Sequence, residues 1–544
     1  MDQSPSRTPT IQPLPRRPRD ALVQLTLLGW GSGIAAIVAG LAVSFLLFGY
    51  ALVYWRNADM DLMVIYNALL LNDGKPQQFF DHTGYLTILS LKYWFQLLHG
   101  LGLLDGYSLS TFPRASDPKA FDAAMTAAVR AGRVLAWLIA SGCVLAFAAL
   151  VRLIVRDWRV ALIATFAFAF SGGIAVHSRI LRSELMAAFP VILALMLLIV
   201  IARRAGIARP LWMGLAAALC VLGLENKVQV ILLIGALPIL ALPFGARQSA
   251  SASFWCNPGS GIAATIALTV VAVAAWASWP LVATAYDRTL LDAAHFHPLL
   301  LGRFGAYQVA LLALIVTCMV AFAVLWHVSA AETLASIAAM IVGACVALLA
   351  LDLDYNANNV IAVFNPLEKM LSFADADTAA AANGSNLPAV ARLILDGLGS
   401  VLARCSFVLH SSPRPAVFLT WLIVPGIVYA WHRGQRQVSL QALLLFLAAA
   451  AIDAIGVRRG LKSEYFIFTD PLIILAGAIL LDNLTELRTC KWAPSIGVAL
   501  FVLQIVVGQS EPVKYAFMRR GPEPICEWNR HYLPLMPLYW CGAN

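Results

Sequence analysis

The dominant pattern along the chain is a series of long apolar runs separated by short polar segments. The runs recur from end to end at roughly 18–25 residues, the length that an α-helix needs to cross about 30 Å of hydrocarbon. This pattern predicts about thirteen membrane-spanning helices. They are expected near residues 33–55, 133–154, 160–176, 185–202, 209–222, 228–244, 261–283, 306–327, 333–351, 415–432, 438–455, 466–482 and 493–509. Because the apolar stretch from Ala21 to Trp55 exceeds one span, its beginning is expected along the interface.

Basic residues gather in alternate polar segments, which gives the predicted helices an orientation. Placing the N-terminus in the cytoplasm brings short basic segments to the cytoplasmic side, as the positive-inside rule requires. These basic residues are Arg7, Arg16, Arg17, Arg19, Arg152, Arg156, Arg159, Arg203, Arg204, Arg209, Arg433, Arg436, Arg488 and Lys491. The exported side then receives the long segments 56–132, 283–305 and 352–414 and the tail from 510.

Composition supports the same fold class. The chain is 60% hydrophobic and 12% charged, which lies far outside the range of soluble domains. Its net charge of +9 follows mostly from topology, and no basic stripe interleaved with aromatic residues suggests a nucleic-acid partner. We therefore expect an all-α polytopic membrane protein with about thirteen transmembrane helices and interfacial helices in its exported loops.

The two ends of the chain have their own features. Residues 1–20 are rich in Pro, Ser and Arg, which predicts a disordered cytoplasmic tail. No removable signal peptide is expected, because no short apolar core is followed by a cleavage site. In the exported tail 510–544, Cys526 and Cys541 could pair if that compartment is oxidising.

The first exported segment carries a cluster of ionisable residues immediately beside a predicted span. Its members are Arg56, Asp59, Asp61, Asp81 and His82. Ionisable groups are costly near lipid, so such a cluster indicates a functional site. The apolar spacing of DLMVIYNALLL predicts an interfacial helix that would hold Asp59 at the membrane surface. Its carboxylate could act as a general base or a metal ligand; alternatively, these acids only mark the membrane boundary.

A second constellation, HSRILRSELMAAF, stands at the entry of the predicted span 185–202. Arg179 and Arg182 are three residues apart, so we expect them to share a helix face suited to binding a phosphate. Glu184 could pair with either arginine or take part in the chemistry. Two arginines on the side that should be poor in basic residues favour a functional role over a topological one.

A single lysine and a separate cluster of three basic residues interrupt apolar sequence at predicted membrane edges. Lys227 could neutralise a phosphate, or it could pair with Glu225 or anchor the helix at the interface. Arg458, Arg459 and Lys462 precede the span 466–482, where they suit an anionic headgroup of a bound substrate or an ordinary phospholipid.

One more polar segment offers possible metal ligands. Asp287, Asp292, His295 and His297 make a divalent metal site conceivable, although a polar loop is the favoured interpretation. The chain holds no Walker loop, zincin motif or nucleophile elbow, so ATP-driven pumping and serine hydrolysis lack support.

The order of these motifs resembles the GT-C superfamily of integral-membrane glycosyltransferases, with protein O-mannosyltransferase-like enzymes and lipid A aminoarabinose transferases as the closest groups. The matching features, in chain order, are Arg56 and Asp59 after the first span, Asp81 and His82 before an aromatic-rich helix, Arg133 opening a span, Glu184 after SRILRS, Lys227 opening another span, and the entry KSEYFIFTDP with Tyr465 and Pro471. The resemblance covers residues up to about 245, which separates a GT-C-like module, 21–245, from a more variable one, 246–509.

The resemblance implies an enzyme that takes a sugar from a polyprenyl-phosphate carrier on the exported, periplasmic face of a bacterial inner membrane. It implies a lipid, glycan or protein acceptor and leaves metal assistance open. Asp59 would be the base that orients the acceptor and Glu184 a second acid. The residues expected to bind substrate, with Arg182, Lys227 and Arg459 as phosphate clamps, are Arg56, Asp81, His82, Arg179, Arg182, Lys227, Arg458, Arg459 and Tyr465.

Two other classes of function stay open. A transporter or flippase for a lipid-linked sugar or anionic lipid would use the same basic clusters without chemistry. It should place acids near the bilayer midplane, and Asp453 is the nearest candidate. The other alternative is a scaffold subunit of a polysaccharide assembly machine, in which neither Asp453 nor Asp59 would be needed.

Overall fold

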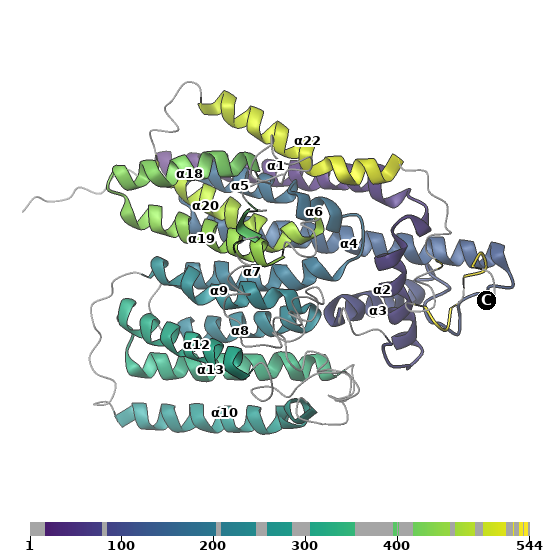
Figure 1. Ribbon diagram of the computed structural model, residues 1–544, viewed down its shortest axis with the longest axis horizontal. Coiled ribbons are helices and arrows are strands. Elements are labelled where there is room, and N and C mark those ends of the chain that lie inside the picture. The colour runs from purple at the N-terminus through teal and green to yellow at the C-terminus, as the bar shows by residue number, and fades with distance from the viewer. Residues whose placement is uncertain are drawn as a thin grey trace, which may run out of the picture.

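The protein is described from a computed structural model. It describes residues 17–78, 84–202, 208–245, 258–284, 305–353, 417–456, 463–484 and 493–517, and also 395, 397–399, 401, 526, 533–536 and 538–541. Every regular element in these residues is a helix, so the predicted all-α class is confirmed for them (Figure 1).

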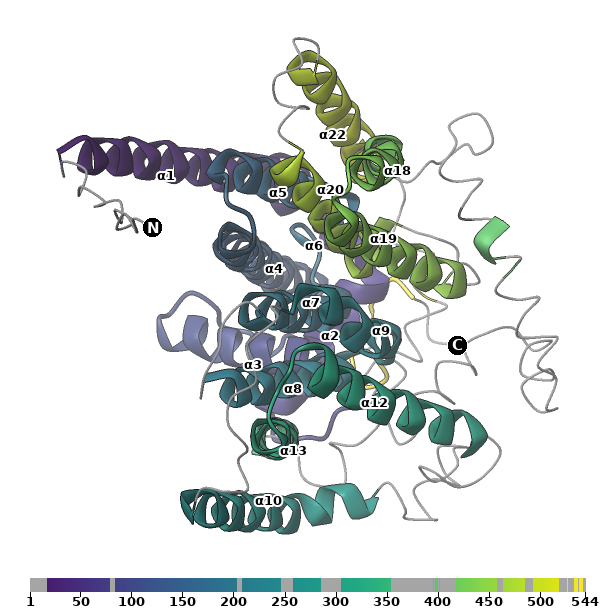
Figure 2. The same ribbon diagram turned by 90° about the vertical axis from the view of Figure 1, so that its left-hand side faces the viewer.

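Most of the helices run roughly parallel as one bundle. The helices of the first half are α1 (Arg17–Phe45), α2 (Ala58–Asn72), α3 (Tyr85–Gly100), α4 (Pro118–Ile154), α5 (Trp158–Ala169), α6 (Gly172–His177), α7 (Ser183–Ala202), α8 (Ala208–Asn226) and α9 (Ile231–Ala241). Those of the second half are α10 (Pro258–Thr284), α12 (Gly305–Leu325), α13 (Ala330–Asp352), α18 (Val417–His432), α19 (Arg436–Gly456), α20 (Asp470–Asn483) and α22 (Ala493–Phe517). In the view along the bundle, α10 and α22 lie at opposite margins (Figure 2).

Short helical turns connect several of these elements. They are the π-turn η1 (Leu46–Tyr50) and the 3-10 turns η2 (Tyr54–Asn57), η3 (Val228–Val230), η4 (Leu242–Phe244) and η7 (Ser463–Phe468). Three of them carry or adjoin residues of the predicted site: η2 contains Arg56, η3 follows Lys227, and η7 contains Tyr465.

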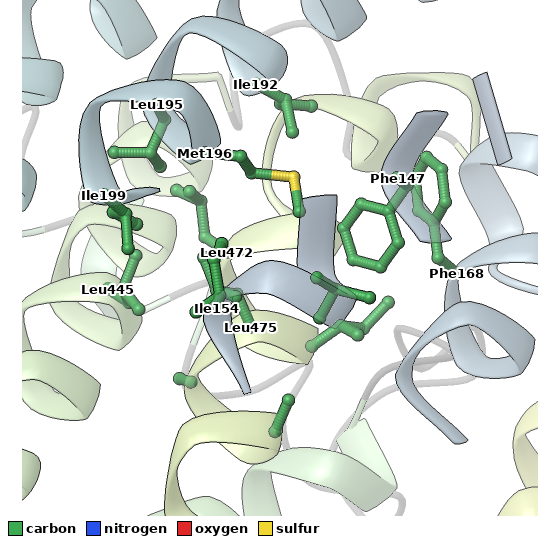
Figure 3. Packing of buried hydrophobic residues seen from close by; sticks show 14 of the residues in the cluster. Phe147, Ile154, Phe168, Ile192, Leu195, Met196, Ile199, Leu445, Leu472 and Leu475 are labelled. Carbon is green, nitrogen blue, oxygen red and sulfur yellow. The ribbon is translucent and has the colours of Figure 1, made fainter. Parts of the chain in front are cut away.

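The centre of the bundle is a continuous apolar core formed by α4, α5, α7, α9, α19 and α20. Phe147 of α4 stacks on Phe168 of α5 with ring centroids 4.5 Å apart. Met196 of α7 and Leu472 of α20 meet in the same core (Figure 3). Glycine lets the backbones of some helices approach more closely than a larger residue would allow. A Cβ on Gly223 of α8 would lie 2.6 Å from the Ala187 carbonyl oxygen of α7.

Five of the described helices are long and apolar enough to cross a membrane. They are Gly29–Tyr50, Pro118–Ile154, Ser183–Ala202, Ala331–Asp352 and Arg436–Ala454. Six further apolar helical stretches of 10–17 residues lie among the described residues, two of them within the longer helices α10 and α12. The predicted helical segments therefore recur in the structure, but the count of about thirteen spans is not confirmed.

Several predicted helix boundaries are wrong. The first described helix includes Arg17 to Asp20, inside the predicted disordered tail 1–20, and it ends with η1 at Tyr50, before a break that separates it from η2. The span predicted at 160–176 is two helices, because Ser171 ends the run and caps α6 by accepting from the Ile174 N–H. The span expected from residue 133 begins at Pro118, after the N-cap Asp117.

At one end of the bundle, α2, α3, the first turns of α4 (118–132) and the C-terminal residues 533–536 and 538–541 form a second apolar core, which we call the end module together with the adjoining loops 73–78 and 101–117. Residues 61–70 of α2 are all buried in it. The segment predicted as an interfacial helix is therefore helical, and residues 61–70 are covered by protein rather than exposed. The physical reason is coverage: α3, α4 and tail residues such as Leu533 and Leu538 enclose both sides of α2.

The opposite end of the bundle carries two basic turns. The Asp482 carboxylate at the end of α20 accepts hydrogen bonds from the backbone N–H groups of Arg156 and Asp157, between α4 and α5. Beside it, Gln435 in the turn between α18 and α19 donates to the Asn483 carbonyl. The basic turns 152–159 and 433–436 thus lie together, as the orientation rule expects, and away from the end module (Figure 1).

Candidate functional site

Glu184 lies at the centre of a buried ion cluster where the end module meets the bundle. It occupies the first turn of α7 and is fully buried. Arg182 approaches both of its carboxylate oxygens, with Nε and Nη2 at 3.2 and 3.1 Å. Lys227 Nζ lies 2.5 Å from Oε1, and His177 Nε2 lies 3.6 Å from Oε2. One carboxylate therefore holds two cations drawn from separate elements.

Lys227 reaches this cluster because the chain breaks between α8 and α9. Asn226 ends α8, and Lys227 takes an extended backbone conformation before the turn η3. Its ammonium group is buried, pairs with Glu184 and also lies 5.6 Å from the ring centroid of Tyr465. Such a position suits a fixed point charge more than an interfacial anchor that reaches toward water.

Asn226 joins the elements around the cluster. Its side-chain amide donates to the Ser183 carbonyl at 2.6 Å, and its Oδ1 accepts from the Thr87 backbone N–H and hydroxyl at 3.1 and 3.2 Å. Its own carbonyl accepts from the Gly84 N–H at 2.8 Å. The start of α3, the start of α7 and the end of α8 are thereby fixed beside Lys227. The sequence pattern assigned no role to Asn226.

The turn η7 closes the cluster from the second half of the chain. Gly173 of α6 packs so tightly against η7 that an added Cβ would lie 2.8 Å from the Ile467 backbone. His177 at the end of α6 bonds through Nδ1 to the Gly173 carbonyl at 2.7 Å. Glu464 in η7 lies 3.5 Å from Arg182. The sequence analysis missed Glu464. Its place between Lys462 and Tyr465, in the charged segment that precedes an apolar run, could have indicated it as a site residue.

Arg179 and Arg182 do not share a helix face, so that prediction is wrong. Both lie in the connection between α6 and α7, and they face different elements. Arg179 donates through Nη2 to Ser44 of α1 and Gln509 of α22, and it lies 5.6 Å from the ring of Phe48.

The Arg179 side chain is buried but incompletely paired. Burial lowers the pKa of Arg179 to about 10, so the side chain keeps its charge at neutral pH. Its Nε and Nη1 have no hydrogen-bond partner among the residues that the structure describes. An anion could therefore satisfy these two donors.

A buried ion pair joins the segment between α6 and α7 to α2. Asp61 accepts from Arg133 Nε at 3.0 Å and from the Leu181 N–H at 3.1 Å. Arg133 also donates to the Leu52 carbonyl at 2.6 Å, where the chain leaves η1. Arg133 was expected to open a span, but it lies inside α4, because that helix begins at Pro118. An arginine within the apolar run RVLAWLIASG was the signal for a buried acidic partner.

The other predicted site residues are described to different extents: some by their backbone alone, some not at all, and Asp453 in full. Arg56 lies in η2 and Asp59 in the first turn of α2, with only their backbone described, two to five residues before Asp61. The residues that lie outside the described ranges are Asp81, His82, Arg458, Arg459, Lys462, Asp287, Asp292, His295 and His297. Asp453, the transporter candidate, is buried near the end of α19 and accepts from the Thr469 hydroxyl at 2.8 Å.

A metal site is not visible in the described part of the chain, where no three His, Cys, Asp or Glu side chains are grouped to hold an ion. The loop that offered possible ligands, 285–304, falls outside that part, so metal assistance stays a prediction. Comparisons of the chain with protein-family models, with curated proteins and with solved structures found no match.

Proposed function

We propose that this protein is a membrane glycosyltransferase that moves a sugar from a polyprenyl-phosphate carrier to a lipid, glycan or protein acceptor. The observation that carries the proposal is the placement of Arg182 and Lys227 on one fully buried carboxylate, Glu184. Two cations fixed side by side where the apolar bundle meets the end module suit a phosphate joined to an apolar chain.

The cations act on the leaving group. As the bond between the anomeric carbon and the phosphate oxygen breaks, the electron pair goes to that oxygen, and its charge is stabilised by Arg182 and Lys227. Glu184 holds both cations in place before the donor binds, so little reorganisation is needed when the charge develops. This role agrees with the geometry of Glu184 better than that of a base, because its oxygens are already engaged by both cations.

The acceptor is activated at the start of α2. Asp59 takes the proton from an acceptor hydroxyl or amine as that group attacks the anomeric carbon. Support comes from Asp61, two residues further along, whose carboxylate bonds to the Leu181 N–H beside Arg182. The helix that carries Asp59 and the connection that carries the phosphate-binding cations are thus tied together.

Arg179 supplies a third cation to the donor. Its buried guanidinium lies between α1 and α22, both of which expose apolar side chains such as Val43 and Val506. A lipid phosphate that enters between these helices would meet the two unpaired donors of Arg179 before it reaches Arg182. The proposal assigns Arg179 to donor binding rather than to the chemical step.

The orientation proposed is a cytoplasmic N-terminus with the site on the periplasmic face of a bacterial inner membrane. Cys526 and Cys541 form a disulfide at the end module, with Cα atoms 5.3 Å apart. Disulfides persist in oxidising compartments. The two basic turns lie at the other end, which the positive-inside rule assigns to the cytoplasm.

The second candidate function is transport of a lipid-linked sugar or anionic lipid without chemistry. The observation in its favour is a pair of buried acids, Asp453 and Asp470, near the junction of α19 and α20. Loss of lipid movement in Asp453→Asn, together with intact function in Asp59→Asn, would favour this candidate over the transferase.

The test of the proposed function uses the purified protein in lipid nanodiscs with radiolabelled polyprenyl-phosphate sugars. We expect wild type to transfer or release the sugar and Lys227→Met to lose about 10²–10³-fold in kcat, the typical loss when one positioned electrostatic group is removed. The matched control is Lys75→Met, which removes a half-exposed lysine paired with Asp73 in the end module. Equal turnover in both variants would contradict the assignment of Lys227.

A further inference from the structure

The C-terminal segment packs into the same core as the start of the candidate site. Leu533, Met536 and Leu538 are buried against α2 and α4, more than 450 residues away in sequence from α2. The backbone N–H of Leu535 donates to the Tyr66 hydroxyl of α2 at 3.2 Å. The described C-terminal residues therefore lie beside α2 (Figure 1).

One carboxylate links this segment to the turn that precedes α2. Asp122, near the start of α4, accepts from the Tyr54 hydroxyl of η2 at 2.5 Å and from the Tyr539 hydroxyl at 2.8 Å. Burial and the neighbouring Asp122 raise the pKa of Tyr54, so its hydroxyl remains a donor throughout the physiological range. The tail, α4 and η2 are thus joined at a single acceptor.

Aromatic packing reinforces the same junction. The ring of Trp540 lies 5.8 Å from that of Tyr54 and 6.2 Å from that of Trp55, and it lies 6.5 Å from that of Phe121 on α4. Tyr54 and Trp55 immediately precede Arg56, and Asp59 follows three residues later. The contacts of the tail therefore fall on the turn that leads into the proposed catalytic residue.

The disulfide closes this segment into a loop. Cys526 and Cys541 are 15 residues apart, and Cys541 follows Trp540 directly. A cross-link reduces the number of conformations available to the unlinked chain, which favours the docked arrangement of the residues it encloses. Leu533, Met536, Leu538, Tyr539 and Trp540 all lie within the closed loop.

We propose that the C-terminal residues 533–536 and 538–541, held by the Cys526–Cys541 disulfide, are a clasp that fixes the turn η2 and thereby positions Asp59 for reaction. Tyr539, Trp540 and Asp122 are the positioning residues, and they act through Tyr54 and Trp55 rather than by touching substrate. The part of this inference that concerns reaction rests on the proposed transferase function. The part that concerns the turn itself does not.

The test compares wild type, Tyr539→Phe and the double variant Cys526→Ser/Cys541→Ser in nanodiscs. Hydrogen exchange of the backbone amides in residues 54–66 reports on the turn, and sugar transfer reports on positioning. The matched control is Tyr107→Phe, a tyrosine of the same core that stacks on His99 at 3.9 Å and does not contact η2 in the contacts described.

We expect Tyr539→Phe to raise exchange at residues 54–66 several-fold and to lower kcat several-fold with little change in KM. The double cysteine variant should show the same pattern more strongly, and Tyr107→Phe should show neither effect. Unchanged exchange at these residues in both clasp variants would overturn the clasp. Faster exchange with unchanged kcat would overturn its role in positioning. A wild type without transferase activity would overturn the proposed function, while the exchange result would still decide whether the clasp holds η2.

Discussion

At the scale of single residues, the molecule depends on buried charged side chains, of which Arg133 is the most completely paired. Arg133 has no exposed surface, yet its guanidinium donates to Asp61 and to the carbonyls of Gly49, Leu52 and Val53. The carbonyl groups freed at the end of η1 are satisfied by the same side chain. A charge can be buried at moderate cost when it is paired and hydrogen-bonded in this way.

Removal of one partner should therefore cost more than removal of both. We expect Arg133→Met to lower the free energy of unfolding by about 3–5 kcal/mol, because Asp61 is left as an uncompensated buried charge. The double variant Asp61→Asn/Arg133→Met should recover part of that loss. Denaturant unfolding in detergent micelles measures both, and a double variant that is less stable than Arg133→Met would contradict this account of the pair.

The single-residue features of the site were partly predictable from sequence. Lys227 and Glu184 could be singled out because ionisable residues at a membrane edge are rare and costly, and the structure brings them together. The different directions of Arg179 and Arg182 could not, because helical spacing was assumed where the chain forms an irregular connection. The partnership of Asp61 and Arg133 joins positions 72 residues apart, which no local pattern reveals.

At the scale of elements, close approach of backbones fixes the site. The helix α6 and the turn η7 meet at Gly173, where the Ile467 N and Cα atoms leave no room for a side chain. This contact sets η7, and with it Glu464 and Tyr465, against His177 and the ion cluster. Glycine is required here by space and not by an unusual backbone angle.

A methyl group at this contact should displace η7. We expect Gly173→Ala to destabilise the protein by about 1–3 kcal/mol, the usual cost of overpacking, and to reduce sugar transfer. Gly142→Ala in α4 is the matched control, because nothing lies within 4 Å of its added Cβ. Thermal unfolding and transfer assays of the two variants provide the comparison, and equal behaviour would contradict the role of this contact.

Element boundaries were less predictable than the elements. Hydropathy located the apolar helices because burial in lipid or in the bundle requires apolar sequence. It could not show that α4 extends back to Pro118, since these first turns pack against α2 and α3 in the end module. Nor could it show that α2 is enclosed, because the enclosing residues 533–541 come from the far end of the chain.

At the scale of the whole molecule, the two ends of the bundle differ in chemistry. One end carries the disulfide and the aromatic residues of the tail, and the ion cluster around Glu184 lies beside it. The other combines the basic turns 152–159 and 433–436 around Asp482 and Asn483. This polarity is what the proposed orientation, with a cytoplasmic N-terminus and the site on the opposite face, requires.

Accessibility of single cysteines tests the orientation. We expect Lys75→Cys, at a half-exposed position in the end module, to react with a membrane-impermeant maleimide in intact spheroplasts. Arg433→Cys, in the exposed turn between α18 and α19, should react only after permeabilisation. Labelling above the wild-type background is the measurement, and the reverse pattern would place the candidate site in the cytoplasm.

Asp59 is proposed as the base that activates the acceptor for transfer of a lipid-linked sugar, and one comparison of variants tests this role most directly. Purified wild type, Asp59→Asn and the control Asp105→Asn, an exposed acid of the end module, are given a panel of radiolabelled polyprenyl-phosphate sugars in nanodiscs. We expect Asp59→Asn to stay folded, to bind the carrier and to lose about 10²–10⁴-fold in transfer, the contribution of a general base. Asp105→Asn should match wild type. Undiminished transfer by Asp59→Asn, or carrier binding without turnover in every protein across the panel, would contradict the account.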